Sequence, residues 1–112
     1  MQNISFFLTT EQVRNKTKTV TRRAGWWNLK PGETLNACVK CQGLKKGEKI
    51  EHICQIRIKS VKPEMLRNIT KAECILEGFP EMEPEEFIRM FCSTHKGCTP
   101  DQVINRIEFV YV

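Results

Sequence analysis

The segment from Gln12 to Gly32 contains no acidic residue and gathers the side chains best suited to an anionic ligand. Its cations and indoles are Arg14, Lys16, Lys18, Arg22, Arg23, Lys30, Trp26 and Trp27. Cations beside flat aromatic surfaces suit a ligand that is negatively charged and carries stackable rings. The composition therefore favours a nucleotide or a nucleic acid strand. A solvated basic face with tryptophans in the core is the alternative.

Lys18 and Thr21 lie three residues apart within this segment, and that spacing constrains how they could act together. Residues 16–22 are rich in threonine and valine, which favours a strand or an extended loop. On a regular strand, two residues three apart point to opposite faces. If both line one pocket, the backbone must bend near Thr19 or Val20.

Glu77 is expected in the last turn of a short helix over residues 71–77. Thr70 and Glu73 have the spacing of a capping box, in which Glu73 serves the cap, and Gly78 follows the helix end. The helix dipole presents partial negative charge at this end, which disfavours a carboxylate anion. The position suits an acid/base group or an anion paired with a nearby lysine. An exposed and slightly costly carboxylate is the alternative.

Six cysteines are many for this length, and without a signal peptide they are interpreted as reduced thiols: Cys38, Cys41, Cys54, Cys74, Cys92 and Cys98. Their spacing, with His95 between the last two, raises the hypothesis of a zinc site. A strand expected over 35–42 would point Cys38 and Cys41 to opposite faces, so buried free thiols are favoured. No metal and no cofactor is expected.

The elements that must position these residues indicate a small α+β domain, plausibly a closed or partly closed barrel. Strands are expected over 4–8, 34–42, 52–61 and 103–112, the middle two forming an antiparallel hairpin. Helices are expected over 10–15, capped by Thr9 and Gln12, over 71–77, and after Pro84. With 112 residues, the chain is expected to form a single domain spanning 1–112.

Charge and hydropathy limit the setting in which the chain works. The net charge of +5 is compatible with phosphate-bearing partners. No apolar run is long enough to span a bilayer, and the N-terminus lacks the basic flank and cleavage site of a leader. A cytoplasmic protein with no membrane partner is therefore expected.

The segment Lys18-Thr19-Val20-Thr21-Arg22-Arg23, the turn at 29–33 and the strand through 107–109 together resemble the ASCH domains, a branch of the PUA-like superfamily. The resemblance covers essentially the whole chain. It implies a PUA-like small β-barrel with short flanking helices, a cleft near the basic segment, and RNA or nucleotide binding. In such a cleft, Lys18, Arg22 and Arg23 would contact phosphates, with Arg22 and Arg23 on the rim, and Lys16 is a further candidate for ligand binding. Trp26 or Trp27 would stack on a base, and one of the two could belong to the core.

One ASCH subgroup comprises small amidohydrolases that remove the acetyl group from N-acetylcytidine with a Lys, a Thr and a Glu. By resemblance these positions are Lys18, Thr21 and Glu77. Thr21 would attack the acetyl carbonyl and Lys18 would accept its proton, while Glu77 would position the lysine or protonate the leaving amine. This chain departs from the subgroup at Arg22, where the pattern has an apolar residue. RNA or nucleotide binding is therefore the favoured function, with hydrolysis and a zinc-stabilised interaction domain as alternatives.

Overall fold

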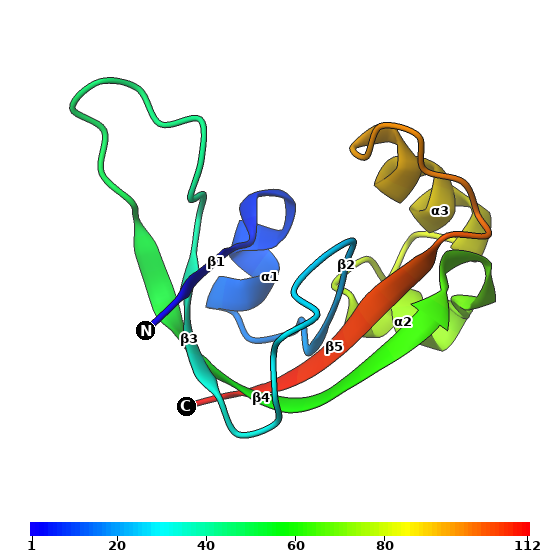
Figure 1. Cartoon of the computed structure of the whole chain (residues 1–112), viewed down its shortest axis with the longest axis horizontal. Helices are drawn as coiled ribbons and strands as arrows, with labels where there is room; N and C mark the ends of the chain where they lie inside the picture. Colours follow the sequence, from blue (N-terminus) through cyan, green and yellow to red (C-terminus); the bar gives the residue numbers. More distant parts are fainter.

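Five strands form one open sheet in the order β1-β3-β4-β5-β2, in a computed structural model that describes residues 1–112 (Figure 1). The strands are β1 (Asn3–Ser5), β2 (Val20–Arg23), β3 (Thr34–Cys38), β4 (His52–Met65) and β5 (Val103–Tyr111). β1 runs parallel to β3, and every other neighbouring pair is antiparallel. The edge strands β1 and β2 do not pair with each other, so the α+β class holds while the expected closed barrel is not confirmed.

Three short helices and two 3₁₀ turns accompany the sheet. They are η1 (Phe7–Thr9), α1 (Thr10–Arg14), η2 (Leu66–Asn68), α2 (Lys71–Leu76) and α3 (Pro84–Ser93). The first two predicted helices are confirmed to within one residue at each end, and the third begins at Pro84 as predicted. In α3 the predicted proline start is accompanied by a capping box between Glu83 and Glu86. No helix combines the length and the apolar character that crossing a bilayer requires.

The expectations for the N-terminal strand and its helix cap were wrong in detail. β1 ends at Ser5, and the residues that follow turn into η1. Thr9 makes no side-chain cap bond to α1. The Gln12 side chain, expected to reach back to the cap, instead donates from Nε2 to the Gly78 carbonyl at 3.2 Å. A tertiary contact has replaced the local one.

β4 extends four residues beyond its predicted end at Val61 and carries Pro63 inside it. Proline lacks the N–H that a strand between two neighbours would need. β4 pairs with β3 only as far as Arg57, whereas it pairs with β5 as far as Met65. The distal half of β4 therefore has one open side, where a missing donor costs no sheet bond.

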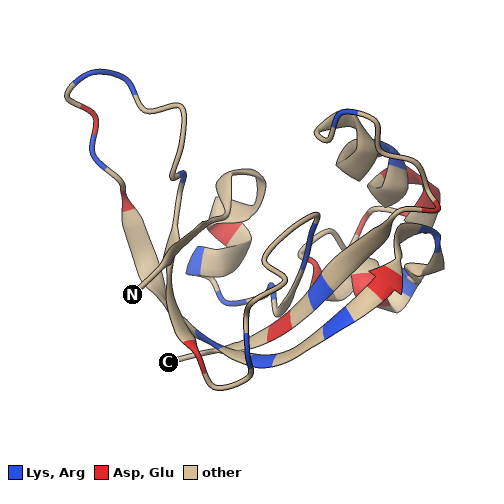
Figure 2. Ribbon diagram, viewed as in Figure 1, with Lys and Arg blue, Asp and Glu red and all other residues tan.

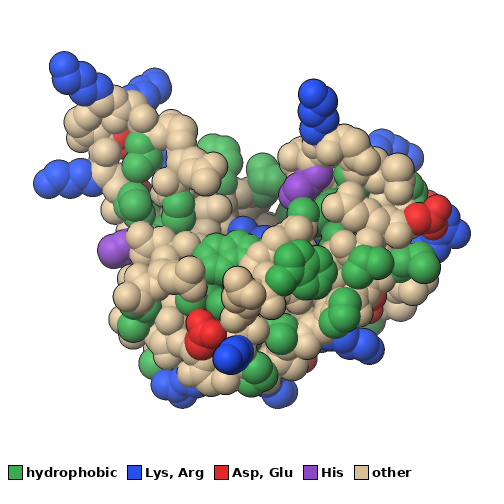
Figure 3. All heavy atoms as spheres, in the orientation of Figure 1, with side chains coloured by type: hydrophobic (Ala, Val, Ile, Leu, Met, Phe, Trp, Pro, Cys, Tyr) green, Lys and Arg blue, Asp and Glu red, His purple; other side chains and the backbone are tan.

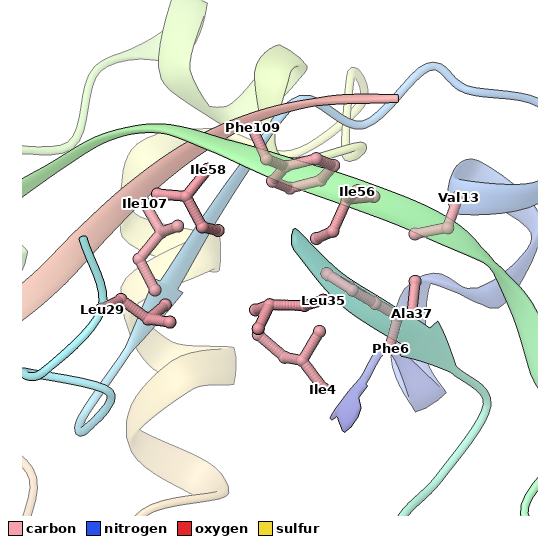
Figure 4. Packing of buried hydrophobic residues seen from close by; sticks show 10 residues of the cluster. All are labelled: Ile4, Phe6, Val13, Leu29, Leu35, Ala37, Ile56, Ile58, Ile107 and Phe109. Carbon is pink, nitrogen blue, oxygen red and sulfur yellow. The ribbon is translucent and has the colours of Figure 1, made fainter. Parts of the chain in front are cut away.

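Two hydrophobic clusters hold these elements together. The larger one lies against the sheet, where the alternating Ile56 and Ile58 of β4 meet Phe109 of β5 and Leu35 of β3 (Figure 4). The smaller one joins Phe87 and Phe91 of α3 to η2, α2 and the beginning of β5. β2 is an edge strand of the sheet, and Arg22 on it contacts Glu73 and Glu77 at α2.

Two projections flank the middle of the molecule. The loop of residues 39–51, between β3 and β4, extends away from the sheet, and α3 with its following loop stands on the other side (Figure 1). Basic residues mark both projections (Figure 2). Lys45, Lys46 and Lys49 are exposed on the first loop and Lys96 on the second.

Candidate functional site

Lys18 lies just outside the regular strand, which frees its side chain from strand alternation. β2 begins only at Val20, and Lys16 adopts a positive φ of 63°. The Tyr111 hydroxyl donates to the Lys18 carbonyl at 2.6 Å, and the Thr19 N–H donates to the Leu76 carbonyl at 2.9 Å. Lys18 and Thr21 can therefore line the same cavity, as they do here.

The Lys18 ammonium is buried against Glu77. Its Nζ donates to Glu77 Oε1 at 2.8 Å and to the Glu77 carbonyl at 2.7 Å, and the side chains are only 3% and 4% exposed. Burial lowers the pKa of Lys18 from its ordinary value, and it outweighs the opposing attraction of Glu77. Repulsion from Arg23 and Arg22 acts in the same direction as burial. The site thus holds a lysine whose charged form is disfavoured.

Glu77 bridges two cations. It is the C-cap residue of α2, and its Oε2 accepts from Arg22 Nη1 at 3.1 Å while Oε1 accepts from Lys18. The sequence left open a carboxylate paired with a nearby lysine and an exposed, unpaired carboxylate. In the structure Glu77 is buried and paired with Lys18, so the expectation of an exposed carboxylate is wrong. Helix-dipole repulsion is offset here by two cations.

Glu73 does not serve the helix cap with its side chain. Its backbone N–H donates to Thr70 Oγ1 at 3.2 Å, which is half of the expected capping box. Its carboxylate instead accepts from Arg106 Nε at 2.6 Å and from Arg22 Nη2 at 2.8 Å. Two arginines compete successfully with one local backbone donor, since hydrogen bonds between charged partners are the stronger ones.

Arg22 is an internal residue, contrary to its expected place on the rim. Its side chain has no exposed surface and binds three carboxylates, those of Glu64, Glu73 and Glu77. Burial is the largest single effect on the pKa of Arg22 and lowers it, but the three carboxylates together outweigh burial and raise the pKa. Every guanidinium nitrogen already has a carboxylate partner, so Arg22 is held inside the protein and is not a free cation for a phosphate.

Arg23, the next residue, has the opposite surroundings. It forms no salt bridge: its Nε donates to Thr21 Oγ1 at 3.0 Å, and its Nη2 donates to the Ser5 carbonyl at 2.6 Å. The guanidinium lies 5.0 Å from the centroid of the Phe6 ring. Burial lowers the pKa of Arg23 to about 10, which indicates a cation with little compensating negative charge.

Three cavities meet at Arg23. The first has a volume of about 220 Å³ and is also lined by Lys18, Thr21 and Glu77. The second, about 680 Å³, includes Trp26 and Trp27, and the third, about 540 Å³, reaches the loop of residues 39–51. In the space-filling view a notch separates the two projections, with basic atoms at its floor (Figure 3). We refer to the first cavity as the lysine cavity and to all three together as the groove.

The remaining predicted ligand residues divide. Trp27 is 52% exposed and lines the groove, whereas Trp26 also packs on the main core and has a positive φ of 64°. Trp26 is thus both a wall and a core residue. Lys16 lines none of the cavities and extends toward the Tyr111 ring, 6.0 Å from its centroid. The structure therefore does not bring Lys16 to the other candidates.

Sequence reasoning missed the aromatic wall of the lysine cavity. Phe7, Phe79, Phe91 and His95 all line it, and Phe7 is 64% exposed. His95 stacks on Phe91 with ring centroids 4.2 Å apart, and its Nδ1 is 2.8 Å from the Phe91 carbonyl. His95 lies beyond Ser93, where α3 ends, and the turn that follows the helix brings its ring onto Phe91. The four-residue spacing is a signal for neighbours only within a helix. His95 had been considered only as a metal ligand.

Of the six cysteines, only Cys41 lines the groove, in its third cavity. β3 ends at Cys38, so Cys41 belongs to the following loop, and the expected strand over 35–42 was too long. Cys92 and Cys98 have their Sγ atoms 2.6 Å apart. No group of three or more His, Cys, Asp or Glu side chains is arranged to hold a metal ion.

Among known proteins, two solved structures share the fold of this chain. No family model matches the sequence, and no curated protein matches it. A crystal structure of a DUF984-family protein from Enterococcus faecalis V583 superposes with a TM-score of 0.70 at 16% identity, covering 99% of this chain and 79% of that one. An ASCH domain from Lactobacillus crispatus JV V101 superposes with a TM-score of 0.60 at 15% identity, covering 98% and 78%. The chain therefore has an ASCH-like fold.

Proposed function

We propose that this ASCH-like protein binds RNA or nucleotides in the groove centred on Arg23. The observation that carries the proposal is Arg23 itself, a half-buried arginine shared by three cavities with no carboxylate partner. A guanidinium is a planar fork of donors that matches a phosphate. An uncompensated cation of this kind favours an anionic ligand over solvent.

The walls of the groove supply what a nucleotide needs besides charge. Trp27 is exposed beside Arg23, and Phe7 and His95 stand at the mouth of the lysine cavity. Aromatic faces bind single-stranded bases by stacking, with little dependence on sequence. The lysines on both projections add longer-range attraction for a phosphate backbone (Figure 2). These features favour single-stranded RNA or a free nucleotide over a duplex.

Fluorescence anisotropy with short labelled single-stranded RNA, and competition by free nucleotides, tests this proposal. The logarithm of Kd should rise linearly with the logarithm of the salt concentration, because each phosphate contact releases counterions on binding. Arg23→Gln should weaken binding by about tenfold or more, the cost of one charge-assisted contact. Arg89→Gln is the matched control, because Arg89 is exposed on α3 and forms no ion pair. It should leave affinity nearly unchanged. No binding of RNA or nucleotides at low salt, or equal losses in the two variants, would refute the proposal.

A second candidate function is removal of an acyl group from an acylated cytidine. Its support is that Lys18, Thr21 and Glu77 line one cavity, with Lys18 and Glu77 in hydrogen-bond contact. Burial lowers the pKa of Lys18, which brings the amine closer to the range in which it can exchange a proton with a ligand. Thr21 Oγ1 accepts from Arg23 and has no protein acceptor for its own hydrogen. That hydroxyl is thus available to a base or a ligand.

In this reaction the Thr21 oxygen would attack the acyl carbonyl while Lys18 takes the hydroxyl proton. Lys18 would return the proton to the departing amine, and water would then cleave the threonine ester to release the acid. Glu77 would hold the lysine in place. No hydrogen bond joins Lys18 to Thr21 here, so the proton transfer requires a small approach or one bridging water.

Incubation with N-acetylcytidine, followed by chromatography for cytidine and acetate, tests the hydrolysis. Thr21→Val and Lys18→Met should each abolish turnover, while Thr17→Val, in the exposed loop before Lys18, should retain it. Absence of turnover, or turnover that survives in Thr21→Val, removes the hydrolase and leaves ligand binding to be judged by the RNA experiment.

A further inference from the structure

Arg22 is a buried cation that contacts three carboxylates with a single positive charge. It extends from β2 to Glu64 on β4 and to Glu73 and Glu77 at α2. Glu73 is already held by Arg106, with contacts at 2.6 and 3.1 Å. Arg22 is therefore not needed to neutralise Glu73. Its contacts with Glu64 and Glu77 are the ones that no other arginine makes.

The Glu77 carboxylate is divided between Arg22 and Lys18. One oxygen, Oε1, lies 2.8 Å from Lys18 Nζ, and the other, Oε2, lies 3.1 Å from Arg22 Nη1. A single negative charge thus faces two buried positive charges. Each cation weakens the hold of Glu77 on the other, because like charges in a poorly hydrated site repel.

The other groups around Lys18 do not replace the missing negative charge. Its second acceptor is the neutral Glu77 carbonyl, at 2.7 Å. From β2, Arg23 adds another positive charge, and from β5 the Tyr111 hydroxyl contacts only the Lys18 carbonyl. An ammonium has three hydrogens to donate. The third finds no protein acceptor on this side of the cavity.

We propose that Arg22 is a positioning residue. It binds one carboxylate oxygen of Glu77 and offsets part of the negative charge that faces Lys18, so Lys18 releases its proton more readily. The inference rests on the lysine cavity as the site of the second candidate function. It assigns a role to the residue at which this chain differs from the amidohydrolase pattern. Arg22 lines the lysine cavity, but each of its nitrogens is bound to a carboxylate, so it acts on Lys18 through Glu77.

NMR titration of protein labelled with ¹³C and ¹⁵N at lysine, following the Lys18 Cε and Nζ signals, measures this effect without any ligand. The informative variant is Arg22→Met combined with Glu64→Gln, which removes one charge of each sign and keeps the local sum constant. The titration midpoint of Lys18 should rise by about one unit or more, because Glu77 then acts on Lys18 alone. Glu64→Gln by itself should leave the midpoint near that of the wild type, since the contact between Arg22 and Glu77 remains.

An unchanged Lys18 midpoint in the double variant would overturn the inference, and so would an equal rise in Glu64→Gln. Arg22→Lys is a second variant for a case in which the double variant fails to fold. It keeps a cation near Glu77, so the Lys18 midpoint should lie above the wild-type value by less than the rise expected for the double variant. A midpoint below the wild-type value would contradict the inference. These readouts do not depend on turnover. A failed hydrolysis assay and a failed positioning role are therefore distinguishable.

Discussion

Replacing Glu77 by glutamine is the sharpest test of the buried charge cluster. Glu77→Gln keeps the size and shape of the side chain but removes the negative charge that faces Lys18 Nζ at 2.8 Å and Arg22 Nη1 at 3.1 Å. At an effective dielectric constant of about 20, each contact is worth about 5–6 kcal/mol of Coulomb attraction. Most of that is offset by the cost of burying the charges, and removing one partner of a buried pair typically costs about 3–5 kcal/mol.

The expected loss lies at the lower end of this range for two structural reasons. Arg22 keeps Glu64 and Glu73 as partners after the substitution. Lys18 can lose its proton, because burial has already lowered its pKa. We therefore expect Glu77→Gln to lower the free energy of unfolding by about 3 kcal/mol. In a domain of this size the corresponding fall in melting temperature is about 12 °C.

Urea denaturation and thermal melting, both followed by circular dichroism, measure this loss. Glu81→Gln is the matched control, because Glu81 is exposed and forms no ion pair; it should be indistinguishable from the wild type. Lys18→Met should cost less than Glu77→Gln, because Glu77 then remains paired with Arg22. If Glu77→Gln matches the control, or if Lys18→Met is the more damaging change, the account of Glu77 as the centre of the cluster is wrong.

Two further predictions concern the same region. The wild type should gain stability relative to Lys18→Met as the pH rises from the lowered folded-state pKa of Lys18 toward 10.5, because over that interval the unfolded lysine binds more protons than the folded one. Urea titrations at several pH values measure this difference in unfolding free energy. A difference that stays flat or falls with pH contradicts the lowered pKa. Gly78→Ala should destabilise the protein more than Gly47→Ala: both glycines have positive φ, 99° and 82°, but a Cβ on Gly78 would lie 3.0 Å from Gln12 Cγ, whereas Gly47 has open space around it. Backbone strain of about 1–3 kcal/mol is common to both changes, and equal losses in urea unfolding would show that the Gln12 contact is soft.

Local sequence signals were sufficient for much of the fold. The alternation in β4 and β5, the proline start of α3 and the threonine cap of α2 are each set by residues within a few positions of one another. Such signals act through backbone dihedrals and hydrogen bonds between near neighbours, so they are visible in a single sequence. They failed where a distant group offered a better partner, as when Gln12 bonded to Gly78 rather than to its own helix.

The sequence by itself determined that cations, hydroxyls and tryptophans gather before Gly32, and its motif singled out Lys18, Thr21 and Glu77. Only the tertiary structure decided that Lys18 meets Glu77 across 59 positions of the chain. It also separated two adjacent arginines: Arg22 turns inward to three carboxylates, and Arg23 is left at the meeting point of the groove. The physical reason is that the effect of a charge depends on which opposite charges lie within a few ångströms and on how much water is excluded. Those partners come from α2 and β4, which only the folded chain brings to β2.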